Sequence, residues 1–96
     1  MDKLLVLYTM KGCVHCETMK TQLKEEGIDY YDRDIDEYSD EYDMFVEITE
    51  NDYVPAFMIV ESPEVEPKTL LFAPGKDFDE IGDGVNIIKE HFNDEL

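Results

Sequence analysis

The chain has 96 residues, the size of one small domain, and we expect residues 1–96 to form a single domain. Its 8 Lys and Arg against 25 Asp and Glu give a formal net charge of −17. This charge argues against nucleic acid and anionic membranes as partners, because both surfaces are themselves negative.

The sequence shows no pattern of a signal peptide or a membrane span. The apolar run over residues 4–7 is shorter than the roughly 7–15 residues of a signal-peptide core and the ~20 of a spanning helix. The cysteines are Cys13 and Cys16, whereas small secreted scaffolds usually carry four or more. We therefore expect a cytoplasmic protein, and we expect it to be a monomer.

The first third of the chain predicts a strand, a helix and a second strand. The nearly continuous apolar run over residues 3–8 is typical of a buried strand. Over residues 13–26 the apolar side chains fall at helical spacing, and Gly27 follows where a left-handed residue ends many helices. A strand over 28–34 completes a βαβ unit, whose two strands run parallel.

The rest of the chain predicts two more strands and two more helices. Asp36 is expected to cap a helix that runs to about residue 51. Strands over 56–60 and 69–73 flank an exposed loop over 61–68, and the last helix begins at Asp83 or Gly84. The order β-α-β-α-β-β-α predicts an α/β protein, a four-stranded mixed sheet with three helices distributed over both faces.

The pattern that carries chemistry is the C-x-x-C of Cys13 and Cys16, between the first strand and the first helix. Unpaired N–H groups and the dipole at a helix N-terminus favour an anion. We therefore expect the pKa of the Cys13 thiol to fall from about 8.5 toward ~3.5–7.5. Cys13 then attacks a disulfide and Cys16 resolves the mixed disulfide. His15 and Lys11 are expected to stabilise the thiolate.

Other chemistries for these residues are less well supported. Zinc needs four ligands, and only His15 and His91 remain as nitrogen donors, so we predict no metal site. The alternating Asp32, Asp34 and Asp36 lack the glycine and the glutamate that a calcium loop requires. A pair of unreactive cysteines is the remaining alternative. The acidic residues over 29–52 predict a solvated face that favours a neutral or basic partner.

Three segments resemble the glutaredoxin family. Residues 8–16, YTMKGCVHC, resemble the active-site segment of glutaredoxins and of the glutaredoxin-like hydrogen donors of ribonucleotide reductase. Residues 53–55, YVP, are similar to the family's Thr-Val-Pro, whose proline is cis and faces the cysteines. Residues 81–84, IGDG, are similar to the family's Gly-Gly segment before the last helix. The resemblance implies the thioredoxin fold and a redox-active Cys13–Cys16 disulfide, with no tightly bound cofactor.

The resemblance also implies a binding site for substrate or glutathione. Its residues would be Tyr8, Lys11, Val14, Tyr53, Val54, Pro55, Gly82 and Asp83. For Tyr8 and Tyr53, however, we favour core packing over contact with substrate. Met10 stands where glutaredoxins usually carry Lys or Arg, and Asp83 stands where they carry a second glycine that faces glutathione.

The implied substrates are protein disulfides, with ribonucleotide reductase as a candidate. Electrons would come from glutathione or from a thioredoxin-reductase-like flavoenzyme. Two alternatives stay open at this point. One is a glutaredoxin dimer that binds an iron–sulfur cluster with glutathione, and the other is a thioredoxin-fold interaction subunit without catalysis.

Overall fold

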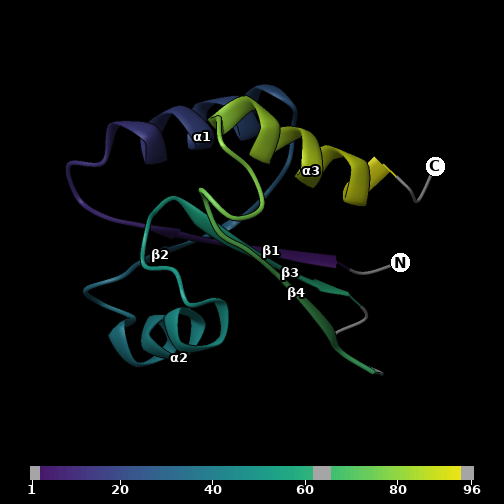
Figure 1. The fold of residues 1–96 in the computed structure, drawn as a ribbon. Helices are drawn as coiled ribbons and strands as arrows, with labels where there is room; N and C mark the ends of the chain where they lie inside the picture. Colours follow the sequence, from purple (N-terminus) through teal and green to yellow (C-terminus); the bar gives the residue numbers. More distant parts are fainter. Residues whose placement is uncertain (1–2, 62–65, 94–96) are drawn as a thin grey trace.

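A computed structural model describes residues 3–61 and 66–93 (Figure 1). In chain order the elements are β1 (Lys3–Thr9), α1 (Val14–Glu25), β2 (Tyr31–Asp34), α2 (Ser39–Thr49), β3 (Ala56–Glu61), β4 (Lys68–Phe72) and α3 (Ile81–Asn93). The strands form one sheet in the order β2-β1-β3-β4, in which β1 is parallel to β2 and antiparallel to β3, and β3 is antiparallel to β4. The predicted order of elements and the mixed sheet are confirmed.

The two faces of the sheet carry separate cores because side chains alternate along each strand. Leu5 and Leu7 of β1 join the core beneath α1 and α3, whereas Val6 and Tyr8 join the core beneath α2. Figure 1 shows α1 and α3 together on one face and α2 on the other. Helices therefore lie on both faces, as predicted.

Both later helices begin at positions other than those predicted. Asp36 does not cap α2, because Tyr38 holds the N-cap position, without a side-chain cap. The side chain of Asp34 accepts the Asp36 N–H at 2.8 Å and its carbonyl accepts the Tyr38 N–H at 2.9 Å, which folds this stretch into a turn. α3 begins at Ile81 and includes Asp83 in its first turn, where the helix dipole favours a carboxylate.

Several strand boundaries also differ from those predicted from the sequence. β2 begins at Tyr31, opposite Val6, three residues later than expected. The ends of the predicted 61–68 loop belong to strands, since Glu61 pairs with Lys68. Residues 62–65 of that loop lie outside the described residues. Within the described ranges, no helix is long and apolar enough to cross a membrane.

Two tyrosines in the core beneath α2 differ in how their hydroxyls are satisfied. The Tyr8 hydroxyl donates to Glu41 Oε2 at 2.7 Å. The Tyr42 hydroxyl is buried and has no hydrogen-bond partner among the described residues. Burial raises the pKa of both phenols, and the bond to Glu41 raises that of Tyr8 further. The two rings lie 5.7 Å apart, so they provide matched probes of one core.

We expect opposite effects on stability from removing the two hydroxyls. Tyr42→Phe should raise the free energy of unfolding by about 1 kcal/mol, because a buried hydroxyl without a partner carries an uncompensated desolvation cost. Tyr8→Phe should lower it by about 1 kcal/mol, because a made hydrogen bond is lost. Urea unfolding at neutral pH measures both. A Tyr42→Phe protein less stable than the Tyr8→Phe protein would contradict this account.

Candidate functional site

A tight turn carries the chain from β1 into α1 and places Cys13 at the helix N-terminus. Gly12 has φ +78°, a left-handed conformation that favours glycine, and the Cys13 N–H donates to the Met10 carbonyl at 3.2 Å. Cys13 is the N-cap of α1, and its Sγ accepts the N–H of Cys16 at 3.1 Å. The sulfur thus takes the place of the side-chain oxygen that caps many helices.

The two cysteines form a disulfide in this structure, with their Cα atoms 5.2 Å apart. Their environments differ sharply. Cys16 is 0% exposed, whereas Cys13 is partly exposed. A reagent from solvent therefore reaches the Cys13 sulfur first, and the sulfur of Cys16 is reached through Cys13.

A groove of about 320 Å³ lies at the start of α1. Its walls come from the start of α1, the loop before β3, the segment after β4 and the start of α3: they are His15, Val54, Pro55, Pro74, Phe78, Asp79, Glu80 and Ile81. The Val54–Pro55 peptide bond is cis, as the sequence predicts. His15, which lies between the two cysteines in the chain, lines the groove, and neither cysteine is among its walls.

The charge in this groove is acidic. Asp79 and Glu80 line it, and neither Lys nor Arg is among its walls. Both carboxylate side chains are exposed to solvent. A bound segment that carries positive charge is favoured here, and one that carries carboxylates is repelled.

Some residues predicted for the binding site lie elsewhere. Tyr8 is 1% exposed and packs in the core beneath α2, which is the role that the sequence favours for it over contact with substrate. Gly82 and Asp83 are exposed in the first turn of α3 but are not among the groove walls. Lys11 lines a separate polar hollow on the other side of the Gly12 turn.

Other predicted residues are accessible near the groove. Tyr53, for which the sequence also favours core packing, is instead 67% exposed and stands next to Val54. Val14 is 75% exposed at the start of α1. Neither His15 nor Lys11 donates a hydrogen bond to the Cys13 sulfur within the described part of the chain. Their predicted effect on the thiolate stays a prediction.

The wall formed by residues after β4 was missed by the sequence analysis. Pro74 and Gly75 signal a chain reversal, but not the place where the chain then lies. The reversal is closed by the Gly75 N–H, which donates to the Phe78 carbonyl at 2.7 Å. Phe78 stacks on Phe57 of β3, with ring centroids 5.5 Å apart, and this packing brings Asp79 and Glu80 to the groove.

Polar contacts behind the Gly12 turn tie α1 to β1 and β2. Lys20 Nζ lies 2.7 Å from Asp32 Oδ2, and the Thr9 hydroxyl donates to Asp32 Oδ1 at 2.6 Å. Although partial burial opposes the effect, these bonds lower the pKa of Asp32. Asp32 is thus engaged in a structural contact. Within the described residues, no group of three or more His, Cys, Asp and Glu side chains could hold a metal ion.

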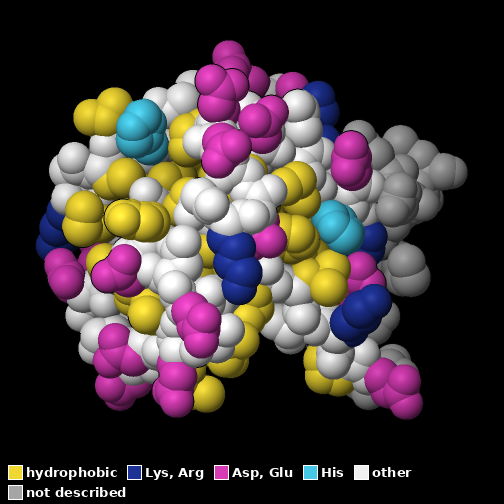
Figure 2. Space-filling model, in the orientation of Figure 1, with side chains coloured by type: hydrophobic (Ala, Val, Ile, Leu, Met, Phe, Trp, Pro, Cys, Tyr) yellow, Lys and Arg dark blue, Asp and Glu magenta, His cyan; other side chains and the backbone are white. Residues whose placement is uncertain are grey.

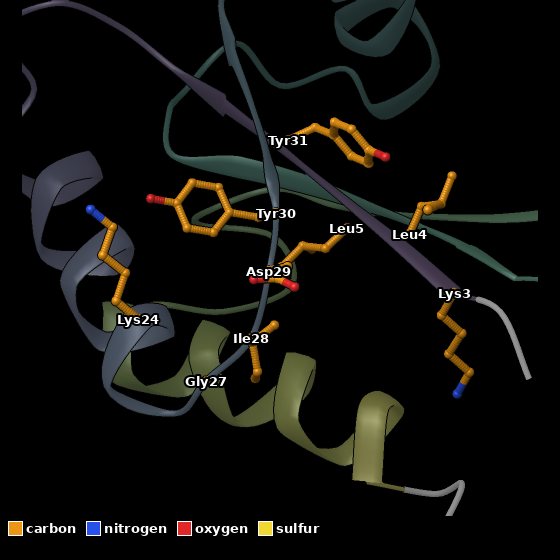
Figure 3. A pocket seen from close by; sticks show the side chains of 9 residues that line it. All are labelled: Lys3, Leu4, Leu5, Lys24, Gly27, Ile28, Asp29, Tyr30 and Tyr31. Atoms are coloured by element: carbon orange, nitrogen blue, oxygen red, sulfur yellow. The ribbon is translucent and has the colours of Figure 1, made fainter.

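A further hollow lies at the far end of α1 from the cysteines. It has a volume of about 780 Å³ and is lined by the start of β1 and by residues 27–31. Figure 3 shows Lys3 and Lys24 at its opposite ends, pointing away from each other. The Lys3 ammonium donates to the His91 carbonyl of α3. The two cations do not converge on one ligand group.

Comparisons with known proteins assign a family to more than half of the chain. The family model described as Glutaredoxin matches residues 5–62, which contain the cysteine pair and Val54–Pro55. Among solved structures, the crystal structure of a variant of the thioredoxin-like protein BC3987 matches with a TM-score of 0.50 and 17% sequence identity, over 55% of this chain and 72% of that one. This likeness shows the fold. No curated protein matches the chain.

Proposed function

The chain belongs to the glutaredoxin family of thiol–disulfide oxidoreductases, with a thioredoxin-like fold, and we propose that it reduces protein disulfides through a reversible Cys13–Cys16 disulfide. One observation carries the proposal. Cys13 is the partly exposed N-cap of α1, whereas its partner Cys16 is fully buried one turn later. This asymmetry suits one thiol for attack on a substrate and the other for resolution.

The proposed cycle begins with the reduced protein. The Cys13 thiolate attacks one sulfur of the substrate disulfide, the substrate S–S bond breaks, and the departing thiolate takes a proton from solvent. Cys16 then loses its proton and attacks Cys13 Sγ. The Cys13–Cys16 disulfide forms, the second substrate thiol leaves, and two electrons have passed to the substrate. His15 and Lys11 are proposed to favour the initial thiolate through their charge.

The acidic groove bears on the source of electrons. Glutathione carries two carboxylates and one ammonium group, and Asp79 and Glu80 would repel the carboxylates. Met10 supplies no cation at the place where glutaredoxins usually carry one. We therefore favour a thioredoxin-reductase-like flavoenzyme as the reductant. The same lining disfavours a glutathione-ligated iron–sulfur cluster.

The substrate is proposed to be a segment of another protein that enters the groove beside Pro55. Val54, Tyr53 and Val14 are the accessible residues that would meet it. Ribonucleotide reductase remains the candidate that the sequence resemblance supports, and a reducing compartment such as the cytoplasm suits a dithiol donor.

Replacing the cysteines one at a time tests whether Cys13 attacks the substrate and Cys16 resolves the mixed disulfide. Cys13→Ser should abolish reduction of a protein disulfide such as that of insulin, because no nucleophile reaches the substrate. Cys16→Ala should also stop turnover but should accumulate a mixed disulfide through Cys13, because nothing resolves it. Mass spectrometry of the trapped complex identifies the linked residue. Turnover retained by Cys13→Ser would refute the mechanism and support a non-catalytic role.

Neutralising the groove tests the choice of reductant. We expect Asp79→Asn with Glu80→Gln to speed reduction of the oxidised protein by glutathione about three- to tenfold at low salt, with a smaller gain at high salt. The control is Asp43→Asn with Glu90→Gln, which removes the same charge at exposed positions that do not line the groove. Equal acceleration in both variants would show that the net charge of the protein, and not the charge of the groove, limits the rate of reduction by glutathione.

A further inference from the structure

The face of the sheet beneath α2 is only partly covered. The strand register places a row of side chains across this face, which runs Tyr31, Val6, Met58 and Leu71. Among the residues that the structure describes, α2 is the one helix on this side, and two helices cover the other (Figure 1). α2 packs over Tyr8 and its neighbours, and Met58 and Leu71 in the adjacent strip of sheet are only half-buried.

A largely apolar groove of about 520 Å³ lies between α2 and this strip. α2 contributes Met44, Phe45 and Ile48 to it, and the sheet contributes Met58, Thr69 and Leu71. Met44 and Ile48 are one helical turn apart and are 64% and 65% exposed. A contiguous apolar patch of this kind marks an interaction site, and methionine adapts its shape to a partner.

Acidic side chains border the apolar residues. α2 contains Asp40, Glu41, Asp43 and Glu47 and neither Lys nor Arg. Glu41 lines the groove itself, and Asp40 lies one turn before Met44 on the same side of the helix. Figure 2 shows acidic side chains gathered over the region of α2. An occupant that places cations around its apolar side chains is therefore complementary to this surface.

A second copy of the chain is a poor occupant. Each copy carries a formal charge of −17, and contact through this groove would bring the two acidic α2 helices together. Like charges held close across an interface weaken association.

We propose that the groove between α2 and the sheet binds an amphipathic helix of a partner protein, whose apolar ridge is flanked by lysines and arginines. The 11 residues of α2 span about three turns, which matches a ridge with anchors at i, i+4 and i+7. This docking surface lies on the face of the sheet opposite α1 and α3, and it makes no use of the cysteine pair.

Synthetic peptides of 14 residues test this surface on the oxidised protein, so that the outcome does not depend on disulfide exchange. The first peptide carries leucines at i, i+4 and i+7 and lysines elsewhere. The second replaces each lysine by glutamate, and the third scrambles the first so that no apolar ridge forms. Methyl NMR spectra report where each peptide binds. We expect the first peptide to shift the methyl signals of Met44, Ile48 and Met58, and the other two to leave them unchanged.

Matched variants decide whether the groove is responsible. Met44→Gln and Ile48→Gln should each weaken binding of the first peptide at least tenfold, and their exposure lets the fold tolerate both changes, as melting curves would verify. Met10→Gln is the control, because Met10 is 44% exposed and lines a different hollow. Binding unaffected by the groove variants, equal binding of the scrambled peptide, or shifts centred on the methyls of Val54 and Ile81 beside His15 would overturn the proposal. Methyl shifts in the groove that grow with protein concentration in the absence of peptide would also overturn the proposal, because they would show that a second copy of the chain occupies the groove.

Discussion

The N–H of Cys16 points at the sulfur of Cys13, 3.1 Å away, and the function proposed for this protein depends on that contact. The sulfur holds the N-cap position of α1, where partial positive charge from the backbone is concentrated. An anion there needs no dedicated base, because the helix itself stabilises it. The Gly12 turn and the pairing of β1 between two neighbouring strands fix the sulfur at this point.

The acidic residues of the chain matter in two places, at the Cys13 sulfur and at the surfaces that would meet a partner. At the N-terminus of α1, the partial positive charge of the backbone stabilises an anion, whereas salt screens the interaction between exposed charges more than about 8–10 Å apart. At the surfaces, the same carboxylates select partners. Asp79 and Glu80 border the groove beside Pro55, and Glu41 borders the groove under α2. Both surfaces favour a cationic protein over small anionic thiols or a second copy of the chain.

The features that could be predicted from the sequence are those set by local chemistry. The apolar run of β1, the helix after Cys13 and the left-handed Gly27 each carry their own signal within a few residues. The Asp36 cap was wrong because the side chain of Asp34 forms a competing turn. Alternation along β1 places Tyr8 under α2, in the core role that the sequence favours for it.

The groove wall could not be predicted because it depends on long-range packing. Phe78 reaches the site only through its stacking on Phe57, about 20 residues earlier in the chain, and it carries Asp79 and Glu80 with it. No periodicity or motif in residues 76–80 predicts that Phe78 will stack on Phe57. The exposed apolar groove under α2 likewise exists only once the sheet register is known.

The most direct measurement is the rate of alkylation of Cys13 in the reduced protein as a function of pH, with the modified residue identified by mass spectrometry. The account predicts that Cys13 reacts before Cys16 and that its rate rises with a midpoint below pH ~7.5, the upper end of the range for thiols at helix N-termini. A midpoint at or above about 8.5, the value of an ordinary cysteine, would contradict it, as would alkylation of Cys16 first.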